Sequence, residues 1–374
     1  MKIVHIITGL GDGGTEQTLY KICKYDQNND HIVISLTGSG KYFSLLNTIG
    51  IKVHCFKINL ISFFQYYHFL KLLHSLNPNI VQTWLVHADF IGGIAAKLLG
   101  IRNIIWNIRY SNLEIGKAKL STILIIKILA RLSYKIPRHI IVVSKKAKKI
   151  YTTMGYDRKK LKFIPNGYDL SILKINNIQK KNFKKILKKN NNIPLIGNVA
   201  RYDPKKGHFN LLKALSITKS KNINFLCLLV GSNITKKNVK LINEIKKLKL
   251  SSHVKLLGQR NDIPTVMNGL DIYVHSSGYG EGFPNVVAES MACGTPCVVT
   301  DVGDASYIVG KTGWVVGSNN FLELASAIEK AIFEQKTKNW NKRCKEARSR
   351  VKESFDISKM VNSYNKVWYE KFII

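Results

Sequence analysis

Acidic side chains are scarce in this chain of 374 residues. It contains 23 Asp and Glu against 58 Lys and Arg, which gives a formal net charge of +35 at neutral pH. Such an excess attracts polyanions, namely nucleic acids, anionic membrane surfaces or phosphorylated substrates. The charge follows in part from a composition rich in Lys, Asn and Ile, and it carries no information about the fold.

Long apolar runs and organised cysteines are missing as well. No uninterrupted apolar run approaches the length of a membrane span. The N-terminal run 1–7 is too short for the core of a signal peptide and leads directly into a glycine-rich loop. The six Cys are scattered without a zinc-binding or disulfide framework, as is typical of reduced thiols. These absences predict a cytoplasmic protein.

Several catalytic motifs are also lacking. The chain has no D-x-D pair, no G-x-S-x-G nucleophile elbow and no G-x-x-x-x-G-K-[ST] phosphate loop. No cluster of His, Cys and acidic residues has the spacing of metal ligands. We therefore expect neither a hydrolase nor a P-loop protein, and we predict no metal and no cofactor.

Short β-branched runs alternate with helical patterns along most of the chain. Strands are predicted at 2–8, 31–36, 52–56, 80–83, 103–107 and 139–143, and again at 195–200, 224–230, 253–257, 272–275 and 296–300. This alternation predicts an α/β protein with two doubly wound, Rossmann-like domains and a ligand cleft between the carboxyl ends of their sheets.

The alternation pauses once. The segment 171–192 has seven Lys, many Asn and no acid, which indicates an interdomain linker containing a polar helix. The predicted domains are therefore 1–170 and 193–355. The remaining stretch, 356–374, has a helical pattern.

A glycine-rich loop follows the first predicted strand. Gly9, Gly11 and Gly14 match G-x-G-x-x-G between a strand and a helix, the context of dinucleotide binding. That function also requires an acid at the end of the second strand, where this chain has Leu36-Thr37. NAD and FAD are thus disfavoured, and two interpretations stay open: a backbone that approaches a diphosphate or a sugar, and a plain tight turn.

Two carboxylates and a helix start lie close together in the stretch 276–290. Glu281 is on a Gly-rich loop, and Glu289 is one turn into a helix that is expected to begin near Asn285. A helix N-terminus offers unpaired N–H groups and a positive dipole end, which suit an anion or a hydroxyl-rich ligand. The alternative is a capped surface helix with solvated Glu side chains.

Other charged residues follow predicted strands. Arg201 and Lys206 are two cations where a diphosphate could bind, although in so basic a chain they could equally be solvated. His87 and Arg109 also follow strands, and a lone His is more often structural. The segment Pro165-Asn166-Gly167 has the composition of a turn.

Taken in order, these segments resemble the family-4 retaining glycosyltransferases of the GT-B fold, over nearly the whole chain. The most specific match is the E-x7-E motif from Glu281 to Glu289. The other matches are weaker one by one: Gly13-Gly14-Thr15-Glu16, His87, Pro165-Asn166-Gly167, Arg201, Lys206-Gly207, Leu257-Gly258-Gln259-Arg260 and Gly294-Thr295-Pro296.

The resemblance implies a role for each matching residue. Glu281 and the backbone N–H groups of Phe283 and Asn285 would hold the hydroxyls of the transferred sugar, and Glu289 would bind the ribose. Gly282 and Pro284 would also belong to the donor site. Arg201 and Lys206 would neutralise the diphosphate without a metal, Arg260 would lie beside the base, and Gly13 and Gly14 would also contact the donor. His87 would face the sugar and the acceptor, whereas Arg109 and Asn166 would contact the acceptor. A C-terminal helix at 356–374 would pack on the N-terminal domain.

The implied substrates are a nucleotide-diphosphate sugar, expected to be a UDP-sugar, and a glycan acceptor, expected to be lipid-linked. Lys127, Arg131 and Lys135 form a basic stripe on an otherwise apolar helix at 119–135, within the basic region 117–149. This pattern suits either an anionic inner-membrane surface or a buried helix with one solvated stripe. A GT-B phosphorylase or epimerase is an alternative. A nucleic-acid-binding protein is disfavoured, because no such motif is present.

Overall fold

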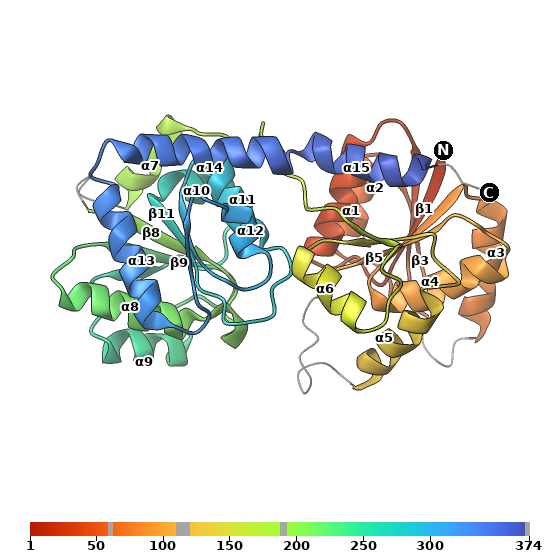
Figure 1. The fold of residues 1–374 in the computed structure, drawn as a ribbon, viewed down its shortest axis with the longest axis horizontal. Coiled ribbons are helices and arrows are strands. Elements are labelled where there is room, and N and C mark those ends of the chain that lie inside the picture. Colours follow the sequence, from red (N-terminus) through yellow and green to blue (C-terminus); the bar gives the residue numbers. More distant parts are fainter. Residues whose placement is uncertain (59–62, 110–119, 188–192, 371–374) are drawn as a thin grey trace. The chain divides into compact units, whose positions relative to one another are not determined.

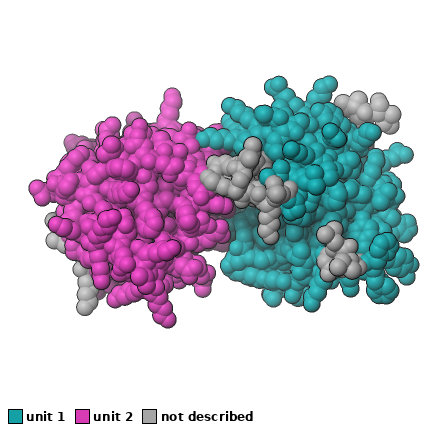
Figure 2. Space-filling model, turned by 90° about the horizontal axis from the view of Figure 1, so that it is seen from below, with its two compact units in different colours: residues 1–167, 357–374 teal, residues 168–356 magenta. Residues whose placement is uncertain are grey.

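The computed structural model of the chain describes residues 1–58, 63–109, 120–187 and 193–370. The chain divides into two compact units, coloured separately in Figure 2. Unit 1 consists of residues 1–167 and 357–374, and unit 2 of residues 168–356. Each unit is an α/β domain built on its own parallel sheet (Figure 1).

Unit 1 contains a seven-stranded sheet in the order β3-β2-β1-β4-β5-β6-β7, in which every described pair of strands is parallel. The strands are β1 (Lys2–Ile7), β2 (Asp30–Ser35), β3 (Lys52–Cys55), β4 (Ile80–Trp84), β5 (Ile104–Ile108), β6 (His139–Val142) and β7 (Leu161–Phe163). The helices are α1 (Gly14–Tyr25), α2 (Lys41–Thr48), α3 (Phe63–Leu76), α4 (Val86–Leu98), α5 (Leu120–Leu132), α6 (Lys145–Thr153) and α15 (Ile357–Tyr369).

The alternation of side chains along β1 shows why both faces of this sheet are covered. Val4 and Ile6 belong to a core shared with α3, α4, α5 and α6. Ile3 and Ile7 belong to a second core shared with α1, α2 and α15. Successive residues of a strand point to opposite faces of the sheet. A strand whose side chains are apolar on both faces therefore needs helices on both sides of the sheet.

Unit 2 contains a six-stranded parallel sheet in the order β10-β9-β8-β11-β12-β13. The strands are β8 (Leu195–Val199), β9 (Leu226–Val230), β10 (Val254–Leu256), β11 (Ile272–His275), β12 (Cys297–Thr300) and β13 (Trp314–Val316). The helices are α7 (Asn177–Ile186), α8 (His208–Ser220), α9 (Val239–Lys247), α10 (Ile263–Gly269), α11 (Asn285–Ala292), α12 (Ala305–Val309), α13 (Phe321–Glu334) and α14 (Asn339–Phe355), with a short 3-10 helix, η1 (Pro204–Lys206).

The segment expected to be a linker, 171–192, lies within unit 2 as far as the structure describes it. Its helix α7 buries Phe183, which leaves no room for a side chain at Gly269 of α10. Lys180 and Lys184 of α7 both pair with the buried carboxylate of Asp271, at 3.2 and 2.7 Å. A composition that suggested a solvated linker therefore belongs to a helix with one apolar anchor and two paired cations.

The predicted fold class is confirmed. The structure has two Rossmann-like domains, and the C-terminal helix α15 returns to unit 1, where Tyr364 and Trp368 are buried in its core. The short edge strands β7 and β13 and the helix α2 were not predicted from the sequence. No helix among the described residues combines the length and the apolar character needed to cross a membrane.

Candidate active site

The strand order of unit 2 places a ligand-binding position between β8 and β11. The chain extends from β8 to β9 and β10 in one direction, and from β11 to β12 and β13 in the other. The loops that leave these two adjacent strands at their carboxyl ends therefore diverge, and open α/β sheets bind their ligands at such a switch point. The two loops are 200–207 and 276–284.

The loop after β8 is held in a tight turn by its own residues. The Asp203 side chain accepts a hydrogen bond from the Lys205 N–H at 3.0 Å and caps η1. Gly207 follows with a φ of 64°, and a Cβ at this position would lie 2.0 Å from the carbonyl oxygen of Ser276. A glycine is required here by both the backbone conformation and the close approach of the second loop.

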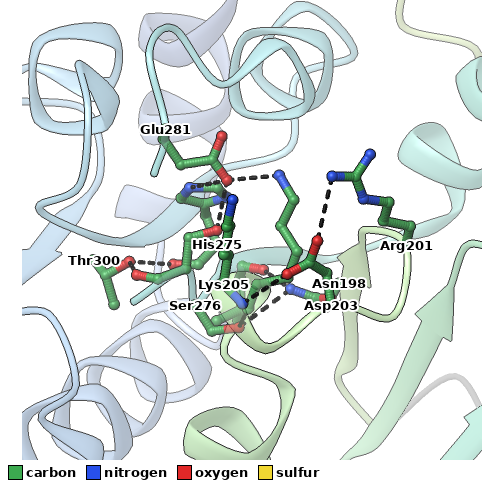
Figure 3. A network of polar contacts seen from close by, with 11 residues as sticks. Asn198, Arg201, Asp203, Lys205, His275, Ser276, Glu281 and Thr300 are labelled. Atoms are coloured by element: carbon green, nitrogen blue, oxygen red, sulfur yellow. Dashed lines mark hydrogen bonds and ion pairs between the residues drawn. The ribbon is translucent and has the colours of Figure 1, made fainter. Parts of the chain in front are cut away.

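Lys206 and Glu281, one from each loop, form an ion pair at this position (Figure 3). The Lys206 Nζ donates to Glu281 Oε1 at 2.7 Å, and the Ser277 hydroxyl donates to the same oxygen at 2.7 Å. The other carboxylate oxygen, Oε2, has no hydrogen-bond partner in the part of the chain that is described. One oxygen of Glu281 is thus fixed, and the second is available to a ligand.

The charge of Glu281 is set by opposing effects. Burial would raise the pKa of this carboxyl, but the charge of His275 when it is protonated, the charge of Lys206 and the hydrogen bonds from Lys206 and Ser277 hold it below its ordinary value. Burial lowers the pKa of His275 to about 4, so this imidazole is neutral near pH 7. Lys206 and Ser277 therefore keep Glu281 ionised at neutral pH.

Further hydrogen bonds join the two loops to each other. The Ser276 hydroxyl donates to the Lys206 carbonyl at 2.9 Å, and the Gly278 N–H donates to the Lys205 carbonyl at 2.8 Å. From β12, the Thr300 hydroxyl donates to the Ser277 carbonyl at 2.7 Å, and Thr300 lies on the side of the network opposite Arg201 (Figure 3). This bonding makes the Lys206–Glu281 pair part of a preorganised frame rather than a surface contact.

The helix α11 begins directly after this loop. Pro284 stands at its N-cap and supplies no side-chain cap to the helix. Phe283 is buried and packs edge-on against Phe355, at 5.5 Å between ring centroids. Glu289 is half-buried in the second turn of α11. Gly282 is held through its carbonyl, which accepts from the Asp304 N–H at 2.8 Å.

The two predicted arginines of unit 2 differ in their surroundings. Arg201, on the loop after β8, is largely exposed and makes a 3.2 Å contact with Asp203. Arg260 follows β10, on the far side of β9 from β8, and its Nε and Nη2 donate to the two oxygens of the Asp262 carboxylate, at 2.8 and 2.5 Å. The structure thus places Arg201 on the same loop as Lys206, whereas Arg260 is bound in a bidentate pair of its own.

In unit 1, Gly13, Gly14 and His87 follow β1 and β4, the two strands on either side of the corresponding switch point, whereas Arg109 follows β5 and Asn166 follows β7. Gly13 is the N-cap of α1, without a side-chain cap, and Gly14 is the exposed first residue of that helix. His87 is exposed in the first turn of α4, after β4. The N-cap of α4 is Leu85, whose φ of 75° and ψ of 155° are a backbone conformation almost restricted to glycine.

Arg109 and Asn166 contact each other. The Arg109 guanidinium donates to the Asn166 side-chain oxygen at 2.5 Å, to the Asn107 side-chain oxygen at 3.0 Å and to the Tyr364 hydroxyl of α15 at 2.8 Å. It also lies 5.3 Å from the ring centroid of Trp84. These contacts connect α15 to the carboxyl ends of β4 and β5. Arg109 therefore stabilises the packing of α15 on the sheet, whether or not it also contacts a substrate.

One group of potential metal ligands occurs among the described residues, formed by His5, Cys23 and His31 in the core of unit 1. The Trp84 indole N–H donates to His5 Nδ1 at 3.2 Å, so the proton of a neutral His5 is on Nε2. That N–H donates to His31 Nδ1 at 2.9 Å, and His31 Nε2 donates to the Asp26 carboxylate at 3.1 Å. Each ring nitrogen already has a partner, and the group does not fit a metal.

Sequence reasoning did not single out Ser277 and His275 as site residues. Ser277 stands four residues before Glu281 on the same loop, and its bond to Glu281 depends on how that loop folds back. His275 ends β11, with its Nε2 buried 3.8 Å from Glu281 Oε1. The only indication in the sequence was a polar residue at the end of a buried strand. A buried His is more often structural, so this indication was not specific for a site.

Two family profiles match the chain, and together they span most of it. The profile described as Glycosyltransferase Family 4 matches residues 12–172, and the one described as Glycosyl transferases group 1 matches residues 179–350. An Escherichia coli UDP-Gal:alpha-D-GlcNAc-diphosphoundecaprenol alpha-1,3-galactosyltransferase is 26% identical over 81% of this chain and 78% of its own length. A Campylobacter jejuni N,N'-diacetylbacillosaminyl-diphospho-undecaprenol alpha-1,3-N-acetylgalactosaminyltransferase is 27% identical over 72% of this chain and 73% of its own.

Solved structures agree on the fold. The crystal structure of HepE from Anabaena in complex with UDP superposes with a TM-score of 0.88, over 99% of this chain and 100% of that chain, at 23% sequence identity. A glycosyltransferase from Rickettsia africae gives a TM-score of 0.86 over 99% and 98%, at 21% identity. The two family profiles and the two Rossmann-like units lead to one conclusion: the chain belongs to the family-4 glycosyltransferases of the GT-B fold.

Proposed function

We propose that this glycosyltransferase moves a hexose or N-acetylhexosamine, with retention, from a UDP-sugar to a lipid-linked glycan acceptor in the assembly of a cell-surface polysaccharide. The observation that carries the proposal is the Lys206–Glu281 pair, at 2.7 Å, at the switch point of unit 2. In a sugar nucleotide, the hydroxyls of the sugar and the phosphate attached to it are only a few bonds apart. A carboxylate for the hydroxyls and a cation for the phosphate must therefore be neighbours, as these two are.

The charges suit the proposed chemistry. Departure of the nucleotide leaves negative charge on the diphosphate, which preorganised cations and helix N-termini stabilise. Lys206 and the exposed Arg201 supply the cations from the loop after β8, and α11 supplies a helix N-terminus. The available Oε2 of Glu281 can accept from a sugar hydroxyl. With these groups in place no metal is needed for the diphosphate, and we assign the ribose to Glu289.

The identities of donor and acceptor draw on the relatives. The names of the Escherichia coli and Campylobacter jejuni enzymes specify diphosphoundecaprenol-linked acceptors, and the former specifies UDP-Gal as donor. A Staphylococcus aureus relative, 28% identical over 71% of this chain and 70% of its own length, is named a capsular polysaccharide biosynthesis glycosyltransferase. These names support a UDP-sugar, a polyprenyl-linked acceptor and a role in surface polysaccharide assembly.

The test begins with a thermal-shift screen against UDP-, GDP- and dTDP-sugars, because a ligand of the native state raises its apparent stability. The sugar nucleotide that binds is then offered with a polyprenyl-diphosphate-linked glycan. We expect Glu281→Gln to abolish transfer while the fold stays intact. Glu346→Gln is the matched control, since Glu346 also pairs with a lysine, Lys342, but on the exposed surface of α14. Wild-type turnover by Glu281→Gln would refute the site.

We also propose that unit 1 docks on the cytoplasmic, anionic face of the membrane through α5. Lys127 and Arg131 are exposed on this helix, as are Leu124 and Ile128, and these four side chains border a hollow of about 490 Å³. Cations beside exposed apolar side chains suit a phospholipid surface.

Co-sedimentation with anionic vesicles at low salt tests the docking. We expect binding by the wild-type protein and loss of binding on charge reversal of Lys127 and Arg131. Charge reversal of Lys246 and Lys247 on α9 of unit 2 is the matched control and should have little effect. Failure of the wild-type protein to bind anionic vesicles would contradict the proposal.

A further inference from the structure

Tyr168 occupies an unusual place in the chain, since it is the first residue of unit 2 after Gly167 ends the first part of unit 1. Its backbone is fixed on both sides. The Tyr168 N–H donates to the Phe355 carbonyl at 2.9 Å, and Tyr168 forms an isolated parallel bridge with Asp356. A Cβ on Gly167 would lie 2.7 Å from the Cβ of Met360, so the preceding residue cannot shift freely either.

The side chain of Tyr168 reaches the candidate donor site. It is fully buried, and its hydroxyl donates to the Asn285 side-chain oxygen at 2.8 Å. Asn285 is the first residue of α11 and follows the loop that carries Glu281. An amide whose oxygen accepts from Tyr168 has its nitrogen turned the other way, so the hydroxyl determines the orientation of the Asn285 amide.

The segment that holds Tyr168 also holds the preceding part of the loop. The ring of Phe355 packs edge-on against Phe283, while the carbonyl of Phe355 accepts from Tyr168. Phe283 and Asn285 flank the N-cap Pro284. Phe355, the last residue of α14, thus contacts Phe283 directly and Asn285 through Tyr168. If burial of the ring were the only role of this residue, a phenylalanine at position 168 would be sufficient. The hydroxyl adds a directed bond to a residue of the donor loop.

We propose that Tyr168 is a positioning residue for the donor sugar. Its hydroxyl holds Asn285, and with it the first turn of α11, in the orientation that receives the sugar hydroxyls of a UDP-sugar. The inference rests on the proposed function, because it takes the stretch 281–285 to be the sugar-binding part of the donor site. Tyr168 contacts the loop and not the substrate, so its effect is confined to the part of the donor that the loop contacts.

This assignment predicts a selective loss of sugar binding. Tyr168→Phe keeps the buried ring and removes the hydroxyl. We expect it to weaken binding of the UDP-sugar about fivefold to tenfold, the effect of one buried hydrogen bond, and to raise the donor KM by a similar factor with little change in kcat. Binding of UDP, which has no sugar, should stay unchanged. A merely structural role would weaken UDP and UDP-sugar alike.

The experiment measures, by titration calorimetry on the full chain, the affinity for UDP and for UDP-glucose, UDP-galactose and their N-acetylated forms. Tyr364→Phe is the matched control, because it removes a buried hydroxyl of unit 1 that accepts from Asn107 and Arg109 at 2.8 Å each. It should lower thermal stability and leave both affinities unchanged.

The outcomes separate the two proposals. If the wild-type protein binds neither UDP nor any UDP-sugar, the proposed function fails and the inference falls with it. If the wild-type protein binds a UDP-sugar and Tyr168→Phe binds it equally well, only the inference is overturned. A double-mutant cycle with Asn285→Ala gives a second criterion: coupled effects on UDP-sugar affinity support the Tyr168–Asn285 bond, and additive effects refute it.

Discussion

Burial raises the pKa of the Glu281 carboxyl, and Lys206, through its charge and its hydrogen bond, is among the groups that lower it. Lys206→Ala would leave a buried anion without its cation, which we expect to cost about 2 kcal/mol of folding free energy at pH 7, less than for a fully buried pair because Lys206 is partly exposed. In this variant we expect the pKa of Glu281 to be higher than in the wild-type protein, because fewer groups then oppose the effect of burial. The double variant Lys206→Ala/Glu281→Gln removes the anion and should recover much of the loss.

The sign of the pH dependence follows from these shifts. In the wild-type protein the pKa of Glu281 is lowered. Its contribution to the free energy of unfolding is therefore complete above the ordinary pKa, and it is lost as the pH falls through the pKa of the folded state. In Lys206→Ala the pKa is higher, and the variant gains stability relative to the wild type as the pH falls. The difference should thus shrink from about pH 7 to about pH 4, as measured by chemical denaturation. A constant difference would mean that Lys206 does not control this carboxyl.

Leu85 holds a glycine-type backbone conformation directly before the helix that carries His87. A non-glycine residue in this region costs on the order of 1–3 kcal/mol. Leu85→Gly and Leu85→Ala both remove the side chain, but only glycine relieves the strain, so we expect Leu85→Gly to be more stable by about 1–2 kcal/mol. Denaturation of both variants provides the measurement.

The exposed Leu98, the last residue of α4, is the control position, because there the alanine variant should be more stable than the glycine variant, by up to about 1 kcal/mol. The same preference for alanine at position 85 would show that the backbone there is not strained. Strain of this kind often occurs at functional sites, which is consistent with the expected role of His87.

Single residues of the site could be selected from the sequence, but their partners could not. Glu281 and Lys206 stood out because each follows a buried strand within a glycine-containing loop. Their contact depends on which strands are neighbours, and the sequence does not reveal that β8 lies beside β11. Tyr168 gave no signal at all, since its partner Asn285 is 117 residues away along the chain.

At the scale of elements, the site depends on how closely the loops after β8 and β11 approach each other. Gly207→Ala would place a Cβ 2.0 Å from the Ser276 carbonyl and would also strain a φ of 64°. Gly50→Ala is the matched control, with a φ of 79° and nothing within 4 Å of the added atom. We expect Gly50→Ala to cost about 1 kcal/mol, and Gly207→Ala to cost more and to weaken UDP binding.

Equal costs for the two alanine variants, or unchanged UDP affinity in Gly207→Ala, would contradict this account of the loop contact. The comparison separates the two effects at Gly207, because both positions have positive φ and only one has a neighbour. Chemical denaturation and titration with UDP supply the two measurements.

Elements were predictable where a long apolar pattern existed. The buried runs of β1, β8, β9 and β11 are recognisable as strands because parallel strands covered on both faces are apolar throughout. The edge strands β7 and β13 have three residues each, too few to establish a pattern. The helix α7 was predicted, but its packing on α10 depends on Phe183 and on the lysine pairs to Asp271, which are tertiary contacts.

At the scale of the whole molecule, unit 1 is built from both ends of the chain. The helix α15 contributes Tyr364 and Trp368 to its core. The Asn365 amide of the same helix donates to the Asp26 carboxylate at 3.2 Å, at the end of the hydrogen-bonded row formed by Trp84, His5 and His31. The helix α15 is therefore needed to complete the fold of the N-terminal part of the chain.

Asp26 gives a pH-dependent test of this closure. Burial would raise the pKa of Asp26. The carboxylate nevertheless has a pKa of about 2, because it accepts hydrogen bonds from His31, Asn29, Asn365 and the Asn28 N–H. Its stabilisation is complete above its ordinary pKa of about 3.9 and is lost as the pH falls through about 2. Asp26→Asn should thus lower the stability of unit 1 by about 2 kcal/mol from about pH 5 to about pH 8, and by less below about pH 4.

Calorimetric scans of the full chain with and without UDP can assign this loss to one unit. We expect two transitions, because each unit has its own core. Asp26→Asn should lower only the transition of unit 1, whereas UDP, if bound by the loops of unit 2, should raise only the other. A single transition that responds to both changes would show that the two units unfold together, and that the stability of the Asp26 row is shared by the whole chain.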